Sequence, residues 1–202
     1  MKIAIIGKGN VGSAIGDGWA AAGHAVAYGV KAPSGPAEAE TARAAAEADV
    51  VAIATPWAAV ADVVAAAGGL EGKTVIDCTN PLAVVEGRLQ LAIGHTTSGG
   101  EKLAGLAPKA FVFKTLNQSG AENLGGAAAF ATKPVMFVAG DDAARKPAVL
   151  GLVRDLGFEA VDAGPLANSR LLEAFAMLWI DQALVRGAGR RFAFARVHAA
   201  PL

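Results

Sequence analysis

The chain has 202 residues, enough for one domain with a sizeable core. Its 18 basic and 18 acidic side chains balance, so no basic surplus exists to bind nucleic acid or an anionic membrane surface. The 53% hydrophobic content excludes intrinsic disorder, and a single cysteine excludes a disulfide framework. The chain opens on a strand-like segment and its apolar stretches are interrupted by charges and proline. We therefore expect a cytoplasmic globular protein with no leader and no membrane span.

Short β-branched runs alternate along the chain with alanine-rich helical stretches, the pattern of a parallel sheet covered by helices on both faces. Most runs are continuously apolar, as strands buried on both faces should be. The predicted strands are 2–7, 25–30, 50–55, 74–78, 110–114, 134–139 and 159–162. The predicted helices are 11–22, 36–47, 57–67, 99–107, 142–156 and 168–187. The connection 82–98 has no periodic signal, which is typical of a functional or mobile loop.

A glycine-rich loop, Gly7-Lys8-Gly9-Asn10-Val11-Gly12, joins the first strand to the first helix. In such a loop the first glycine permits the tight turn, the second lets the backbone approach a pyrophosphate, and the third lets the helix pack on the strand. The helix N-terminus adds unpaired N–H groups and the positive end of its dipole. The loop predicts a dinucleotide site in a Rossmann-type doubly wound sheet. The alternative is that the glycines serve only a tight turn.

The end of the second strand indicates which dinucleotide binds. Enzymes for NAD usually place an acidic residue there to hold the ribose 2′-hydroxyl. This chain reads Val30-Lys31-Ala32-Pro33-Ser34, and no acid occurs before Glu38. Lys31 would attract a 2′-phosphate and Ser34 would donate a hydrogen bond to it. We expect NADP(H), the alternative being that Lys31 is an ordinary surface lysine.

Polar residues follow the later strands at the edge where ligands of open α/β sheets bind. Pro56 turns the chain off the third strand, and Trp57 lies either against the cofactor or on the core. After the fifth strand, Asn117 and Gln118 offer carboxamides to a nicotinamide or a substrate, and Lys114 is the ionisable candidate for polarising a carbonyl. The alternative for Lys114 is no functional role. No histidine has a carboxylate at catalytic or metal-ligand spacing, so no metal site is expected.

Six motifs occur in the order found in one family: GKGNVG at 7–12, ATPW at 54–57, TNPL at 79–82, SGGEKLA at 98–104, FKTLNQSGAENL at 113–124 and DAGPLANSRLLE at 162–173. With them the chain resembles the coenzyme F-420-dependent NADP oxidoreductase family from Lys2 to about Val197. The segment 164–173 is the most specific, because general Rossmann dehydrogenases do not carry it. Its nucleotide domain is also similar to those of membrane ferric reductases and pyrroline-5-carboxylate reductase, whose further domains this chain is expected to lack.

The resemblance implies hydride transfer between NADPH and coenzyme F-420 or a flavin-type acceptor. It places the acceptor beside Leu166 and Arg170. From their position after the fifth strand, Lys114 and Asn117 are the residues expected to position or polarise it. The expected contacts of NADP(H) from motif and resemblance together are Gly7, Lys8, Gly9, Asn10, Val11, Gly12, Val30, Lys31, Ser34, Thr55, Trp57, Asn80, Leu82 and Gln118.

The sequence departs from the archaeal members, which have Ser-Arg at 30–31, a lysine at Gly35 and a histidine at Lys114. Because arginine grips a phosphate bidentately and lysine is a point charge, we expect a weaker preference for NADP here. Two alternatives stay open: reduction of a small carbonyl or imine substrate, and a non-catalytic module that senses NADP(H). Neither the acceptor nor the direction of transfer follows from the sequence.

The C-terminal part, 163–202, is expected to be a helical extension of the single domain 1–202. The helix predicted at 168–186 begins at Asn168, a good N-cap, and is apolar nearly all round. One sheet face covers only one side of a helix, so we expect a homodimer with this helix at the interface. The alternative is that Phe192–Val197 folds back over the helix within the same chain.

Overall fold

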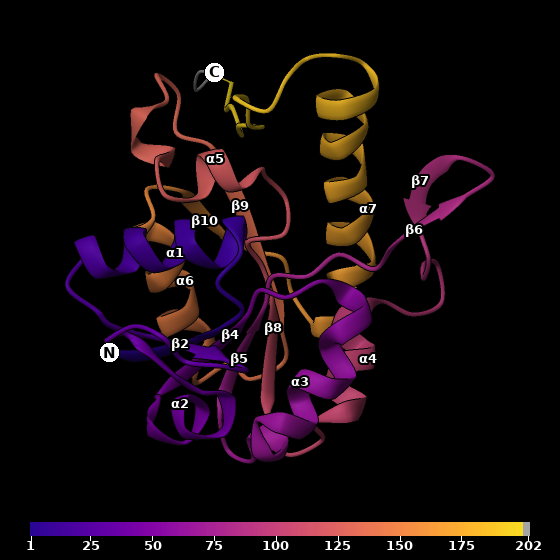
Figure 1. The fold of residues 1–202 in the computed structure, drawn as a ribbon. Helices are drawn as coiled ribbons and strands as arrows, with labels where there is room; N and C mark the ends of the chain where they lie inside the picture. The colour runs from indigo at the N-terminus through magenta and orange to yellow at the C-terminus, as the bar shows by residue number, and fades with distance from the viewer. Residues whose placement is uncertain (200–202) are drawn as a thin grey trace.

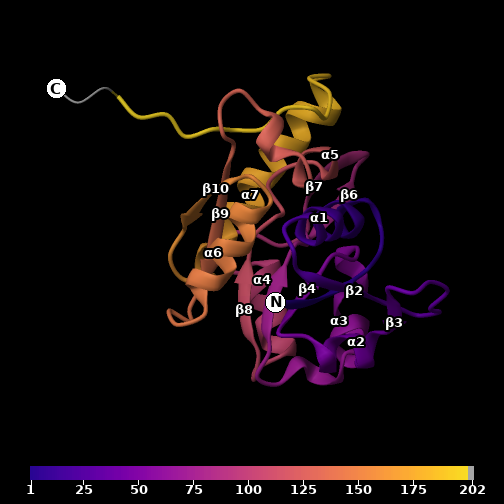
Figure 2. The ribbon, with the colours of Figure 1, turned by 90° about the vertical axis from the view of Figure 1, so that its left-hand side faces the viewer.

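The computed structural model describes residues 1–199, which form an eight-stranded sheet with helices on both faces (Figures 1 and 2). The strand order is β10-β9-β8-β5-β4-β1-β2-β3. The bounds are β1 Lys2–Ile6, β2 Ala25–Val30, β3 Glu38–Glu40, β4 Val50–Ile53, β5 Thr74–Asp77, β8 Phe111–Lys114, β9 Val135–Gly140 and β10 Glu159–Asp162. All neighbours pair in parallel except β8 and β9. The predicted mostly parallel, doubly wound sheet is confirmed.

Alternate residues of the central strands enter two separate cores, which explains their continuous apolar runs. Ile5 and Ala52 face the core under α1 and α6, whereas Ile6 and Ile53 face the core under α2, α3 and α4. The helices are α1 Asn10–Ala21, α2 Thr41–Glu47, α3 Val60–Ala66, α4 Gly99–Leu106, α5 Ala121–Leu124, α6 Lys146–Asp155 and α7 Ser169–Ile180. No helix among the described residues has both the length and the apolarity needed to cross a membrane.

The segment without a periodic signal, 82–98, contains a small hairpin that the sequence did not predict. Its strands are β6 (Leu82–Val85) and β7 (Arg88–Leu91). The two turn residues, Glu86 and Gly87, have φ values of 51° and 74°. Positive φ at both central residues defines a type I′ turn, whose twist matches that of the flanking strands. The hairpin projects beside α7 (Figure 1).

The C-terminal helix differs in detail from the prediction. It starts one residue later, after a 3₁₀ turn at Leu166–Asn168, and continues as a π-helix over Asp181–Val185. The Asn168 side chain accepts no capping hydrogen bond from the helix, and its Nδ2 donates to the Ala163 carbonyl at 2.5 Å. The prediction of a side-chain N-cap was therefore wrong.

The chain after α7 folds back along one side of this helix. Trp179 stacks on Phe192 with ring centroids 5.2 Å apart, and its Nε1 donates to the Phe192 carbonyl at 2.9 Å. Phe175 and Phe194 lie 4.9 Å apart, and the Phe194 carbonyl accepts a bond from the N–H of Val135 in β9. The fold-back considered as the alternative to a dimer thus covers this face of the helix.

Candidate functional site

Two of the three loop glycines are required by the turn itself, and the third is not. Gly7 has φ +105°, and a Cβ on Gly12 would lie 2.0 Å from the Gly7 carbonyl oxygen. A Cβ on Gly9, by contrast, would have no atom of the described residues within 4 Å. Gly9 also precedes the first turn of α1, where the structure of residues 1–199 shows no side-chain cap. Open space before an uncapped helix N-terminus is what an approaching phosphate needs.

Two cavities meet at the carboxyl edge of the sheet. The first, of about 280 Å³, lies between Gly29–Lys31 at the end of β2 and the start of α3, and we call it the β2 cavity. The second, of about 580 Å³, runs from Gly9–Val11 past Trp57 to Cys78–Leu82, and we call it the β5 cavity. Thr55 and Pro56 line both. The Thr55 hydroxyl is buried and finds no hydrogen-bond partner among residues 1–199.

Ser34 and Glu38, which follow β2 in the chain, are hydrogen-bonded to each other, which the sequence did not suggest. Because β3 pairs with β2, Glu38 lies beside Tyr28 rather than beyond the site. Its carboxylate accepts hydrogen bonds from Lys8 Nζ at 2.6 Å and from the Ser34 N–H and Oγ at 2.8 and 3.2 Å. The bond from Lys8, with that from the Ser34 N–H, lowers the pKa of Glu38 to about 2.

Ser34 is therefore not free to bind a phosphate while this arrangement persists. Lys31 is different: it is exposed, lines the β2 cavity, and makes no side-chain hydrogen bond or ion pair within the described part of the chain. Val30 lines the same cavity.

The carboxamides expected to bind a ligand are largely bonded to each other. Asn117 Nδ2 donates to Asn80 Oδ1 at 3.0 Å, and Asn80 Nδ2 donates to the Asn117 carbonyl at 2.9 Å. Gln118 bonds the backbone of Phe137 in β9 through both its Nε2 and its Oε1. Asn117 and Gln118 are buried, whereas Asn80 lines the β5 cavity together with Trp57 and Leu82. The structure thus assigns Asn117 and Gln118 to the cavity's support, not to its surface.

Lys114 is not among the residues that line the β2 or the β5 cavity. Its side chain is 0% exposed, and its Nζ is 2.9 Å from both Asp77 Oδ2 and Glu173 Oε1. Burial opposes its charge, but the two carboxylates outweigh burial and raise the pKa of Lys114. A lysine enclosed in this way cannot polarise a substrate carbonyl, which corrects the role expected from the sequence.

This buried ion cluster, defined as Asp77, Lys114 and Glu173, supports the wall of the β5 cavity. Asp77 Oδ1 accepts bonds from the N–H and hydroxyl of Thr79, and Lys114 Nζ donates to the Thr79 carbonyl at 2.6 Å. Glu173 accepts the N–H groups of Gly99 and Gly100 at the start of α4. The cluster therefore ties α7 and α4 to the turn that carries Asn80. Sequence reasoning missed both acids, although Asp77 and Lys114 close neighbouring strands in register.

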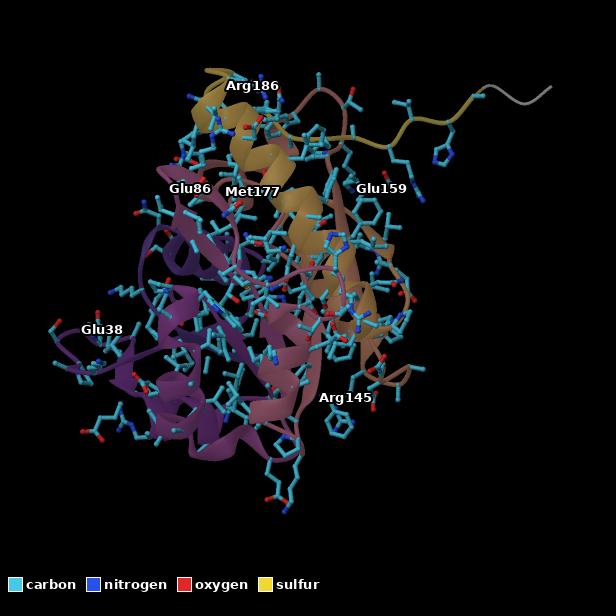
Figure 3. All side chains as sticks on the ribbon, turned by 90° about the vertical axis from the view of Figure 1, so that its right-hand side faces the viewer. Glu38, Glu86, Arg145, Glu159, Met177 and Arg186 are labelled. Carbon is cyan, nitrogen blue, oxygen red and sulfur yellow. The ribbon has the colours of Figure 1, made fainter. Side chains whose placement is uncertain are left out.

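The two residues expected on the acceptor side have different surroundings. Leu166 is buried in the core under α4. Arg170 binds Glu101 bidentately at 2.6 and 2.8 Å and lowers the pKa of that carboxyl. Arg170 lines a third cavity, of about 670 Å³, with His95 and Met177, between the hairpin and α7. In Figure 3, Met177 lies on α7 towards the centre of the view, apart from Glu38 at the left-hand edge.

Comparison with known proteins places this geometry in a family. The family model described as "NADP oxidoreductase coenzyme F420-dependent" matches residues 2–81. A crystal structure from Arthrobacter sp. FB24, named provisionally as an F-420-dependent NADP reductase, is 32% identical, with a TM-score of 0.88 over 98% of this chain and 100% of that one. The chain belongs to the coenzyme F-420-dependent NADP oxidoreductase family.

Three other similar proteins match a smaller share of the chain. Rat metalloreductase STEAP3 is 33% identical over 108 residues, which are 54% of this chain and 21% of that protein, so the chain spans about a fifth of its length. A hypothetical protein from Sinorhizobium meliloti is 28% identical, with a TM-score of 0.69 over 84% and 88% of the two chains. A reductive aminase from Aspergillus terreus is 22% identical, with a TM-score of 0.66 over 92% of this chain and 62% of the aminase chain. The last likeness concerns the fold alone.

The residues present fit a dinucleotide of the kind that the family name implies. Gly9 leaves space for a group that approaches the backbone, and the orphaned Thr55 hydroxyl lies where the two cavities join. Lys31 supplies a positive charge at the end of β2. A glycine loop that served only as a tight turn would need none of these features.

Proposed function

We propose that this protein transfers hydride between NADP(H), bound across the β2 and β5 cavities, and a deazaflavin or flavin-type acceptor. The observation that carries the proposal is the open space at Gly9, before the N-terminus of α1, in the β5 cavity, which adjoins the β2 cavity at Thr55 and Pro56. Membership of the family supports the reaction class. The acceptor follows only from the family's name and from that of the Arthrobacter protein.

The nicotinamide cofactor supplies the hydride chemistry, so the chain's own residues need only bind, orient and exclude water. The N–H groups at the start of α1 receive phosphate, and Lys31 receives the 2′-phosphate. Trp57 and Leu82 form apolar parts of the β5 cavity, suited to a ring. The buried ion cluster fixes Thr79 and thereby the turn that carries Asn80. Such an arrangement holds two rings in contact without an acid–base pair.

The test is spectral. The purified protein is mixed with NADPH and either oxidised F-420 or FMN, and the visible absorbance of the acceptor is followed. We expect loss of that absorbance with one of the two, at a rate proportional to protein concentration. If NADPH binds but neither acceptor is reduced, the proposed acceptor class is wrong. NADPH oxidation with a small carbonyl or imine would then favour that reductase instead, and no oxidation with any acceptor would favour a sensor.

We further infer that two copies of the chain associate through the outer face of α7. After the fold-back, Leu171 and Leu178 remain 66% and 49% exposed on this face, and Val84 of the neighbouring hairpin is 70% exposed. Trp179 is buried against Phe192, so its substitution would test folding rather than association. Leu178→Glu is the better probe. Sedimentation at micromolar concentration should show a dimer that this variant dissociates, and a wild-type mass of 20.2 kDa would exclude the dimer.

A further inference from the structure

The segment that follows α7 contributes one residue, Arg190, to the lining of the β5 cavity. It leaves the π-helix through two glycines of positive φ, Gly187 at 76° and Gly189 at 75°. Asn123 then donates its Nδ2 hydrogens to the carbonyls of Arg190 and Phe192, at 3.0 and 2.9 Å. In Figure 1 this yellow segment passes from the top of α7 towards α5. The backbone around Arg190 is thus held by bonds that do not involve its side chain.

Arg190 is one of the residues that line the β5 cavity, together with Gly9 and Asn10 of the glycine loop. Its ion-pair partner in this structure is Glu122 of α5, whose Oε1 lies 2.7 Å from Arg190 Nε. The two side chains are 46% and 40% exposed. Ion pairs this exposed contribute little and exchange readily. The arginine can therefore leave Glu122 for a stronger anion without a large cost.

We propose that Arg190 binds the diphosphate of the dinucleotide, opposite the N-terminus of α1. This proposal rests on the proposed binding of NADP(H). The start of α1 offers N–H groups on one wall of the cavity, and Arg190 offers a planar fork of donors on another. An arginine fork matches the spacing of phosphate oxygens and forms charge-assisted bonds with them. Arg190, in the segment after α7, thus completes a phosphate site whose other part is the glycine loop.

Glu122 competes with the diphosphate for Arg190 in this arrangement. Removing the arginine and removing its competitor should therefore change cofactor affinity in opposite directions. Arg190→Ala should weaken NADPH binding by about tenfold or more, the usual effect of losing a charge-assisted hydrogen bond. Glu122→Gln should tighten binding by a few fold, since only a weak exposed pair is lost. In the Arg190→Ala background, Glu122→Gln should have no effect.

The measurement is the dissociation constant of NADPH by calorimetry, with adenosine 2′-monophosphate as a probe that lacks the diphosphate. Arg190→Ala should leave the affinity for the probe unchanged. Arg186→Ala is the matched control, because Arg186 lies in the same segment, pairs with Asp181 at 2.9 Å and is not part of the cavity lining. Its affinity for NADPH should equal that of the wild type. Urea unfolding should show that both variants remain folded.

Three results would overturn the proposal while wild-type protein still binds NADPH. They are an Arg190→Ala dissociation constant within about twofold of the wild type, equal weakening in Arg186→Ala, and equal weakening towards the probe. An unchanged NADPH affinity with a raised KM for the acceptor would assign Arg190 to the acceptor instead. Failure of the wild type to bind NADPH would contradict the proposed function itself.

Discussion

The two ends of the candidate cofactor site are built in opposite ways. At the β2 end, Lys31 is exposed and charged, and its side chain has no hydrogen-bond or ion-pair partner within residues 1–199. At the β5 end, Asn117, Gln118 and Lys114 are buried. Each already has a partner within the protein: Asn80, the Phe137 carbonyl and Asp77, respectively. Exposed groups can exchange water for a ligand, whereas buried ones already have their partners. The β2 end can thus recognise the charge of a ligand, whereas the β5 end provides a rigid cavity wall.

The energetic consequences differ as well. A charge added or removed at the β2 end should alter affinity and leave the fold intact, because water screens it. A charge removed from the buried ion cluster leaves its partners uncompensated in a medium of low polarity. The two ends can therefore be separated by measuring stability and affinity on the same variants.

The largest effect is expected from Lys114→Ala. Two buried carboxylates, Asp77 and Glu173, would lose their shared cation, which typically costs about 3–5 kcal/mol of unfolding free energy. Lys109→Ala is the control, because Lys109 pairs with Glu71 while both are about 70% exposed, at 69% and 70%. It should cost less than about 1 kcal/mol. Urea unfolding measures both, and similar losses would show that the buried ion cluster is no more sensitive to the loss of a charge than an exposed ion pair.

The second prediction concerns the glycine loop that joins the two ends. Gly9→Val should abolish NADPH binding and leave the urea midpoint near that of the wild type, because its Cβ points into open space at an ordinary φ of −81°. Gly12→Ala should instead lower stability, by about 1–3 kcal/mol or more, since its Cβ would meet the Gly7 oxygen at 2.0 Å. Normal NADPH binding by the Gly9 variant would mean that the loop is only a turn.

These contrasts show which parts of the site a sequence can predict. The glycine loop is local: strand, turn and helix lie within adjacent residues, so the pattern itself carries the geometry. The pairing of Asn117 with Asn80 and of Gln118 with Phe137 joins residues 37 and 19 positions apart, and residue type alone cannot reveal that a carboxamide is already used. Glu38 was placed beyond the site because the short strand β3, which returns it beside β2, has no apolar pattern of its own.

A third, smaller effect is expected at Lys31. If it receives the 2′-phosphate, NADPH should bind about tenfold or more tightly than NADH, as a charge-assisted contact implies. Lys31→Asp should reverse the preference by repelling the phosphate, without a change in the urea midpoint because the side chain is exposed. Dissociation constants of the two cofactors within about twofold of each other, in the wild type, would show that the β2 end does not recognise charge.

The smallest effect is expected at Glu38, where the β2 end already holds a negative charge. Its carboxylate occupies Lys8 and Ser34, so Glu38→Gln should release these donors, remove a repulsion and tighten NADPH a few fold while leaving NADH unchanged. A pKa of about 2 keeps Glu38 charged at any pH above its unfolded value of 4.5, so the difference should stay constant from about pH 6 to 9. As the pH falls from 4.5 towards 2, the contribution of the Glu38 carboxylate to the free energy of unfolding should decrease, because the group becomes protonated. A loss of NADH affinity in the variant would give Glu38 the opposite role, that of the acid that holds a ribose 2′-hydroxyl.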